Sequence, residues 1–364
     1  MRRRLLNTYL PTLCMLMLIA LYAGCNGCNR TQVSPSESRQ HMGIPNIGNT
    51  CYMNSCLQII ARLYPDLFSR MGNDLGRHGQ TIVDKITDEN SRKYVDRKEA
   101  RMFYNALLRN YNNEHEDKLT YGAQEDAASV LLFLLNNSDI QRIELHTTTT
   151  PIINGNCEPH TNDKSVIFIV DFTGANQENS GESLSMDDIV ENNLYGATPE
   201  DVASRQDVDG EVRGCARAGV KLRIQNLCEL TNSILPIWVK RFTQLSNNDP
   251  SSATKITKPI TNPFKLTISS EYFVNIADAA NINARRDEAP MAGKAAYTSS
   301  LVGFILHEGG GLNSGHYTAY VKTLAGKWMK YNDETVTELP TAPLKEAQAA
   351  YLYFYRADWC MLKR

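Results

Sequence analysis

One cysteine lies where the sequence would turn a thiol into a nucleophile. Cys51 follows the Gly/Asn-rich stretch Asn46–Thr50, and the apolar residues after it recur at helical spacing until Pro65. Because Thr50 is a favourable N-cap residue, Cys51 is predicted to begin a helix. The dipole and free N–H groups of a helix N-terminus lower the pKa of a thiol and raise its thiolate fraction. Asn46 and the amides of this stretch are candidate donors to an oxyanion.

A nucleophilic thiol needs a base, and His316 is the candidate. It opens the second of three predicted strands, which a Gly-rich loop and a turn connect: residues 301–307, 316–321 and 328–333. A β-hairpin would bring Asn332 or Asp333, at the end of the third strand, back beside His316. Cysteine, then histidine, then Asn or Asp is the order of a papain-like triad, whose members need only be neighbours in space.

These two regions resemble the cysteine and histidine boxes of the ubiquitin-specific proteases, the large family of cysteine deubiquitinases. Residues 43–58 are similar to the cysteine box and residues 301–336 to the histidine box, and both motifs are highly specific. Three shorter blocks, each weak alone, lie where the family has them: residues 121–127, 235–242 and 350–356. The resemblance spans about residues 43–357. It implies an α+β, papain-like cysteine protease fold with a helical thumb, a β-rich palm and reduced fingers.

The resemblance also implies a reaction. The thiolate of Cys51 would attack the carbonyl of the last glycine of ubiquitin, and a thioester would form and then be hydrolysed. In the family the residue that orients the histidine corresponds to Asn332, with Asp333 as the second candidate and a support of the site. The Cys51 N–H and the Asn46 side chain would hold the oxyanion. No cofactor is implied, and the implied partners are ubiquitin and ubiquitinated proteins.

Substrate-binding candidates come from the same blocks. An amphipathic helix is predicted over 124–137, with the acids Glu125 and Asp126 in its first turn. The family uses an aspartate corresponding to Asp126 to hold the backbone of ubiquitin's tail, and Gln124 lies beside it. Gly315 would leave room for the slim Gly-Gly tail, and Tyr317 follows the base. The chain departs from the family at Ser129 and Val130, where an acid and an aromatic are usual.

Composition supports one large catalytic domain and excludes some partners. The chain has 364 residues, 42% of them hydrophobic, which is enough for a sizeable core. Its net charge of −2 gives no indication of a nucleic-acid partner. The nine cysteines are irregularly spaced, and Cys157, His160, Cys215 and Cys228 lack the paired spacing of a zinc ribbon, so no metal site is predicted.

The middle of the chain contains an acidic segment and two predicted buried strands. Residues 166–172 and 234–242 have the apolar runs of buried strands. Between them, residues 174–211 contain ten acids and one arginine. Two interpretations stay open for this segment: a solvated, partly disordered loop, or an acidic surface for a basic protein such as ubiquitin.

The N-terminus has the features of an export signal. Arg2–Arg4 precede an apolar run, and Ala23-Gly24-Cys25 resembles a bacterial lipoprotein cleavage site. We therefore predict a signal or membrane anchor over residues 1–25, a polar linker over 26–42 and the catalytic domain over 43–357. The protein would be exported or membrane-associated, for example as a bacterial lipoprotein that acts on host ubiquitin. The alternative is a membrane anchor with the enzyme facing a eukaryotic cytosol.

Two functional alternatives remain open at this stage. The chain could be a protease for another ubiquitin-like modifier, or a ubiquitin-binding pseudoenzyme. The presence of Cys51, His316 and Asn332 argues against the pseudoenzyme. His307, at the end of the first predicted strand, is interpreted as a hydrogen-bonded structural histidine, because His316 already fills the catalytic role.

Overall fold

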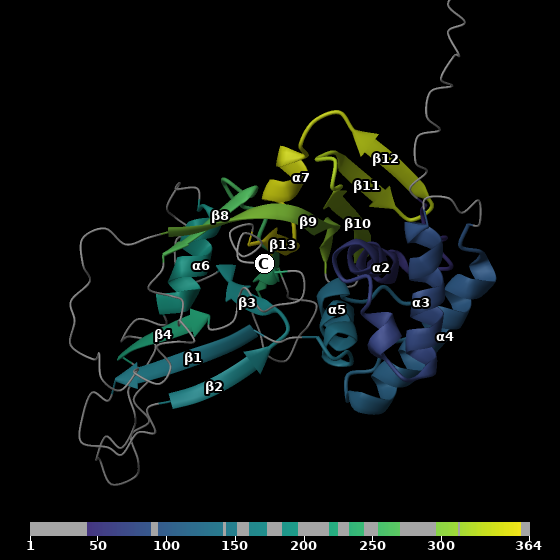
Figure 1. Ribbon diagram of the computed structural model, residues 1–364, viewed down its shortest axis with the longest axis horizontal. Helices are drawn as coiled ribbons and strands as arrows, with labels where there is room; N and C mark the ends of the chain where they lie inside the picture. The colour runs from purple at the N-terminus through teal and green to yellow at the C-terminus, as the bar shows by residue number, and fades with distance from the viewer. Residues whose placement is uncertain are drawn as a thin grey trace, which may run out of the picture. The chain divides into compact units, whose positions relative to one another are not determined.

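A computed structural model describes most of the predicted catalytic domain (Figure 1). The described ranges are residues 42–88, 94–140, 143–150, 160–172, 184–195, 218–224, 233–243, 254–269, 296–311 and 314–357. The predicted leader and nearly all of the predicted linker lie outside them. Among the residues described, no helix combines the length and the apolar character needed to cross a bilayer.

The N-terminal part of the described chain is helical. Its elements are α2 (Cys51–Leu63), the 3-10 turn η1 (Phe68–Arg70), α3 (Asp74–Thr87), α4 (Arg97–Glu114) and α5 (Ala127–Asn136). Local capping explains where three of these helices begin. The Asn73 side chain accepts the Gly76 N–H at the start of α3, and Asp96 forms a capping box with Glu99 at the start of α4. Asp126 caps α5 by accepting the Ala128 N–H.

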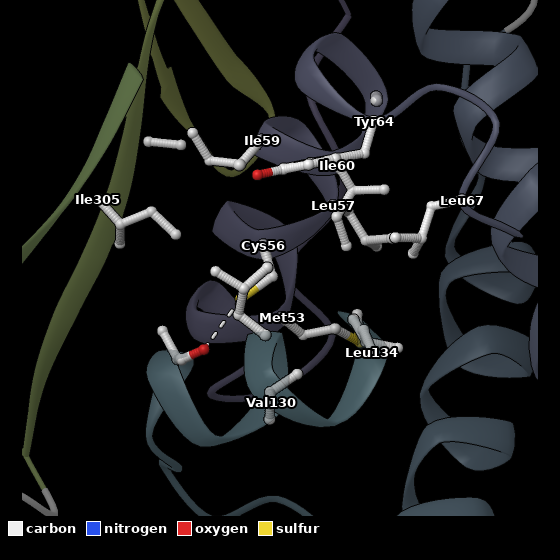
Figure 2. Close-up of a cluster of buried hydrophobic side chains, with 14 of the residues drawn as sticks. Met53, Cys56, Leu57, Ile59, Ile60, Tyr64, Leu67, Val130, Leu134 and Ile305 are labelled. Carbon is white, nitrogen blue, oxygen red and sulfur yellow. Dashed lines mark hydrogen bonds between the residues drawn. The ribbon is translucent and has the colours of Figure 1, made fainter. Parts of the chain in front are cut away.

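Helix α2 is central to the core and not merely amphipathic. Every residue of α2 except Arg62 is buried. In Figure 2, Met53 lies beside Val130 and Leu134 of α5 on one side of the helix. On another side, Ile59 approaches Gly303 of the strand β9 (Ala296–Gly311). A fully buried aliphatic side chain contributes about 1.5–3 kcal/mol, so packing on several sides fixes the N-terminus of α2 firmly.

Within the described residues the large sheet has eight strands, mostly antiparallel. In spatial order they are β12 (Thr335–Leu339), β11 (Trp328–Asn332), β10 (Ser314–Lys322), β9, β13 (Leu352–Arg356), β5 (Ile234–Lys240) and β3 (Phe168–Asp171), with β8 (Lys265–Ser269) paired to β9. Only the β3–β5 pair is parallel among these pairings. Helix α2 packs against β10, β11 and β9, so it lies between this sheet and the other helices (Figure 1).

The remaining described elements are smaller. Strands β1 (Ile143–Thr150), β2 (His160–Ser165) and β4 (Ala218–Ile224) form an antiparallel sheet of three strands. Strand β6 (Phe242–Thr243) pairs with β7 (Thr254–Lys255). Two further helices are α6 (Met186–Tyr195) and α7 (Leu344–Gln348). The predicted buried strands at 166–172 and 234–242 correspond to β3 and β5.

The histidine box differs from its predicted form in two details. The third predicted strand corresponds to β11, which ends at Asn332 as expected, but a further strand follows it: Asp333 turns with φ 50°, and β12 begins at Thr335 and pairs with β11. The Gly-rich stretch 309–311, predicted as a loop, continues β9 and pairs with β10. Glycine-rich sequences usually indicate turns, but cross-strand pairing overrides this local preference.

Part of the acidic segment is helical, which corrects the interpretation of 174–211 as a loop. Helix α6 buries Met186, Ile189, Val190 and Leu194. These residues have the i, i+3, i+4, i+8 spacing of one helical face. Asp187 and Asp188 lie in the first turn, where the helix dipole favours acidic side chains. The apolar pattern was present in the sequence, and the density of acids concealed it.

Candidate active site

Cys51 is the first residue of α2, as predicted, and its side chain is only 2% exposed. The turn before it differs from a simple N-cap. Thr50 makes no side-chain cap, and its Oγ1 instead accepts the Ile47 N–H at 3.1 Å. The Asn46 Oδ1 accepts the N–H groups of Gly48 and Thr50, at 3.0 and 3.3 Å. Asn46 therefore closes the turn that presents the thiol.

The surroundings of Cys51 contain groups that raise the pKa of its thiol and groups that lower it. Burial is the largest effect and raises the pKa of the thiol. The backbone N–H of Tyr317 lowers the pKa, Asp333 raises it, and the N–H groups of Tyr52 and Cys51 lower it. The net pKa lies above the ordinary value, so the predicted depression of the thiol pKa is wrong for this structure. Desolvation outweighs the helix N-terminus, and a base must remove the proton.

The candidate base and its orienting residue are in contact. His316, on β10, has its Nε2 2.6 Å from Asn332 Oδ1, at the end of β11. An amide oxygen only accepts, so Nε2 carries the proton and Nδ1 holds the lone pair needed for a base. The next residue, Tyr317, directs its N–H to the Cys51 sulfur. The start of β10 and the N-terminus of α2 therefore meet at one site.

Asp333 makes different contacts from Asn332. Its carboxylate accepts Asn46 Nδ2 at 2.9 Å and Asn54 Nδ2 at 2.7 Å. Its backbone carbonyl accepts the Ile44 N–H at 2.9 Å. Asp333 thus joins the β11–β12 turn to the segment before Cys51, whereas Asn332 contacts the histidine. This geometry assigns the orienting contact to Asn332 and a supporting one to Asp333; the catalytic weight of each stays a prediction.

The block at 121–127 lies beside the cysteine. Gln124 Nε2 is 3.9 Å from Cys51 Sγ, and Asn49 Nδ2 donates to the Gly122 carbonyl at 2.8 Å. Asp126 is the N-cap of α5, one position before the helix rather than within its first turn. Its other carboxylate oxygen accepts the Tyr351 hydroxyl at 3.0 Å.

The environment of Asp126 limits what its carboxylate does. Burial raises the pKa of Asp126, and the hydrogen bonds from Ala128, Tyr351 and Ser129 oppose this rise. One oxygen already accepts the Ala128 N–H and the other the Tyr351 hydroxyl, so a substrate N–H would have to use a remaining lone pair. The tail-binding role of Asp126 stays a prediction, and its helix-capping role is established by the geometry.

Tyr317 and Gly315 lie on either side of His316 and differ in exposure. The Tyr317 side chain is 2% exposed and packs on His307, with ring centroids 4.5 Å apart. Its backbone N–H is the group that is directed at the Cys51 sulfur. Gly315 is exposed and has φ +148°, and a Cβ there would lie 2.3 Å from His307 Nε2. Glycine is required here because side chains rarely adopt this φ and because the space is filled.

Three supporting residues were not identified from the sequence. Asn54, buried in α2, reaches Asp333. Arg62 donates to the Tyr331 hydroxyl at 2.6 Å and lies 4.1 Å from the centroid of that ring, which holds β11 against α2. Lys255 contacts β9 near His307. A polar residue within an apolar helix was a usable signal for Asn54 and Arg62; no local signal identifies Lys255.

No metal site is visible where side chains are described. Across the described ranges, no three His, Cys, Asp or Glu side chains gather closely enough to hold a metal ion. Cys157, Cys215 and Cys228 lie outside these ranges.

The fold and the site together define a class. A cysteine that begins a central helix, packed against a sheet with a histidine–asparagine pair, is the arrangement of the papain-like thiol hydrolases. The sequence model of the family described as ubiquitin carboxyl-terminal hydrolase matches residues 42–355. The chain belongs to this family, and the predicted membership is confirmed.

Curated relatives and solved structures agree with this assignment. Ubiquitin carboxyl-terminal hydrolase 25 of Arabidopsis thaliana is 26% identical over 348 residues, covering 87% of this chain and 47% of the relative. The mouse ubiquitin carboxyl-terminal hydrolase 17-like protein D is 23% identical, covering 86% of this chain and 54% of the relative. The chain thus spans about half the length of these relatives.

The structural comparison confirms the predicted α+β, papain-like fold of the ubiquitin-specific protease type. A structure of the SAGA DUB module bound to ubiquitin aldehyde matches with a TM-score of 0.61 at 19% identity, covering 95% of this chain and 75% of the other. A second, bound to monoubiquitin, matches with a TM-score of 0.59 at 20% identity and the same coverage.

Proposed function

We propose that this protein is a cysteine-type deubiquitinase that hydrolyses the bond after the C-terminal glycine of ubiquitin on modified proteins. The observation that carries the proposal is the His316–Asn332 contact of 2.6 Å next to Tyr317, whose N–H meets the Cys51 sulfur. The family membership supports the same reaction class. The ubiquitin-bound structural neighbours support ubiquitin as the partner.

In the proposed mechanism His316 is first the base and then the acid. Its Nδ1 takes the proton of the Cys51 thiol, which burial otherwise keeps on sulfur. The thiolate attacks the terminal glycine carbonyl, and the tetrahedral oxyanion is held by the Cys51 N–H and an Asn46 amide N–H. His316 then gives its proton to the leaving lysine amine, and a thioester remains. Water, deprotonated by His316, hydrolyses the thioester and releases ubiquitin and the thiol.

The substrate tail would pass between the cysteine helix and the β9–β10 hairpin. Gln124, whose amide lies 3.9 Å from the sulfur, would donate to the tail or to the oxyanion. Asp126 would accept a tail N–H through its remaining lone pairs. Gly315, which has no side chain, would leave the passage open beside His316.

The test uses activity-based probes on the purified chain. Ubiquitin with a C-terminal electrophile should form a covalent adduct. The same active site should hydrolyse a fluorogenic substrate attached to the C-terminus of ubiquitin. Other ubiquitin-like modifiers with the same electrophile form the comparison set. Faster labelling by one of them would reassign the substrate, and binding of ubiquitin with neither labelling nor turnover would make the protein a pseudoenzyme.

Gly315→Ala is expected to lower kcat/KM by about 10- to 100-fold, because displacing a catalytic group by about 1 Å has effects of this size. The added Cβ would lie 2.3 Å from His307 Nε2 and 2.5 Å from the Glu308 carbonyl, and φ is +148°. The backbone next to His316 must therefore shift.

The matched control for this variant is Gly310→Ala on the same hairpin, where a Cβ has nothing within 4 Å. Steady-state kinetics and circular dichroism should give an active, folded control and a folded but impaired Gly315→Ala. Full activity of Gly315→Ala would contradict the role given to this glycine.

We also propose that residues 1–25 export or anchor the protein, with lipidation at Cys25 as the first of three routes. Lipidation predicts a mature chain that begins at Cys25 with acyl chains, each buried CH₂ contributing about 0.8 kcal/mol to anchoring. A retained helix predicts the full chain in the membrane fraction, and a plain signal predicts a soluble chain that starts near residue 24–28. Intact mass of the protein from its native producer distinguishes these. Full-length, soluble, unprocessed protein in the cytosol would refute all three.

A further inference from the structure

Lys255, on the short strand β7, makes an unusual set of contacts with β9. Its Nζ donates to the backbone carbonyl of His307 at 2.6 Å and to that of Gly309 at 2.8 Å. It also lies 3.4 Å from His307 Nδ1. An ammonium has three N–H donors, so these three acceptors use its whole capacity. The two residues that supply the acceptors lie 52 and 54 positions from Lys255 along the chain.

The ammonium is partly removed from water. Burial lowers the pKa of Lys255, the Arg241 guanidinium lowers it further, and the Glu308 carboxylate raises it. The ring of Phe242 lies beneath it, with Nζ 6.0 Å from the centroid. A partly buried cation without acceptors would be costly, and the C-terminal end of β9 supplies the acceptors. The contact is therefore a fixed part of the structure and not a surface ion pair.

The two residues held by Lys255 both lie against Gly315. A Cβ at Gly315 would meet His307 Nε2 at 2.3 Å, and a Cβ at Gly309 would meet the Gly315 Cα at 2.7 Å. The β9–β10 register shifts between Ser314 and His316, directly at this glycine. Gly315 precedes His316, so a displacement of His307 or Gly309 moves the backbone that carries the base.

The His307 ring is fixed as well as neutral. It is 2% exposed, and its centroid lies 4.5 Å from that of Tyr317 and 5.8 Å from that of Phe242. Burial and the Lys255 cation lower the pKa of His307 to about 4. Because Nδ1 accepts from the ammonium, the ring proton lies on Nε2, the atom that faces Gly315. Lys255 thus determines both the position and the tautomer of the ring beneath the base.

We propose that Lys255 is a positioning residue for the base: by binding His307 and Gly309, it holds the end of β9 so that Gly315 presents His316 to Asn332 and Cys51. The catalytic meaning of this inference rests on the proposed function, whereas the positioning of His316 relative to the thiol does not require ubiquitin. Removing the ammonium leaves two carbonyls and a ring nitrogen without their donor, and each must find water or another partner.

The decisive variant is Lys255→Met, which keeps the length and the apolar stem but loses the donors. We expect kcat on the ubiquitin substrate to fall by about 10- to 100-fold while KM changes less than about threefold, because base positioning acts on the chemical step. Lys255→Arg, which retains donors and charge, should recover part of the loss. The matched control, Lys327→Met, removes an exposed lysine paired with Glu338 and should leave the kinetics unchanged.

A second readout needs no ubiquitin. The rate of Cys51 alkylation by iodoacetamide, measured against pH, reports how well His316 stabilises the thiolate. The midpoint of this profile should move upward by about one pH unit in Lys255→Met, equivalent to about a tenfold slower reaction at a pH below both midpoints. It should stay in place in Lys327→Met. A purely structural role would lower the thermal midpoint without moving the alkylation profile.

The outcomes separate the two proposals. Unchanged kcat and an unchanged alkylation profile in folded Lys255→Met would overturn the inference. A shifted profile in a protein that turns over no ubiquitin would support the inference and overturn the proposed function. If Lys255→Met does not fold, Lys255→Leu, which also lacks the donors, is judged by the same two measurements and the same thresholds.

Discussion

Cys51→Ala is expected to remove ubiquitin hydrolysis and probe labelling, a loss on the order of 10⁴-fold or more, because the covalent route is lost with the sulfur. The fold should persist, since the change deletes one small atom at the start of a helix that is packed along its whole length. Labelling by mass spectrometry, turnover and thermal unfolding measure the three parts of this expectation.

The control for this variant lies on the same helix. Cys56 is buried, and its sulfur donates to the Ala127 carbonyl at 3.2 Å (Figure 2). Burial raises the pKa of Cys56 far above the ordinary range. Cys56→Ala should therefore retain labelling and most of the activity. An adduct mapped to Cys56, or an active Cys51→Ala, would remove Cys51 from the role of nucleophile.

Asn332→Ala should cost about 10²-fold or more in kcat, by analogy with triads in which the orienting residue is lost. The Asn332 Oδ1 accepts from His316 Nε2 at 2.6 Å, and without it the imidazole is free to rotate or to change tautomer. The loss should be larger than that of Asp333→Ala. Steady-state rates of both variants, with their pH profiles, provide the comparison.

Asp333→Ala should differ from Asn332→Ala in kind as well as in size. Asp333 holds Asn46 and Asn54, so its loss should destabilise the turn before Cys51 and lower the thermal midpoint more than Asn332→Ala does. Asp333→Asn, which keeps one acceptor, is the conservative control. If Asp333→Ala has the lower kcat with an unchanged thermal midpoint, the third catalytic role moves to Asp333.

The parts of the site that were predictable depend on short-range patterns. The apolar period after Cys51, ended by Pro65, predicts α2, and the strand and turn residues around His316 predict a hairpin that returns Asn332. The family resemblance added that Asn332, before Asp333, is the candidate for orienting the histidine. In each case a few neighbouring residues carry enough information to define the local structure.

The parts that were not predictable depend on distant contacts. The pKa of Cys51 follows from how deeply the folded chain buries it, which no local pattern states. The Lys255 tether joins residues about fifty positions apart, and its lysine looks like any surface lysine in the sequence. Helix α6 has a periodic apolar face, but it lies in a segment whose many acids are typical of a solvated loop.

The Asp333 bridge has a consequence for biosynthesis. Asp333 and Asn46 are separated by 287 residues along the chain, and their side chains are 2.9 Å apart. During translation Cys51 leaves the ribosome long before its base and its orienting amide exist. A nascent chain therefore carries the thiol without the machinery to use it. Because contacts of such large sequence separation form late, proteolytic competence should be among the last properties that the folding chain acquires.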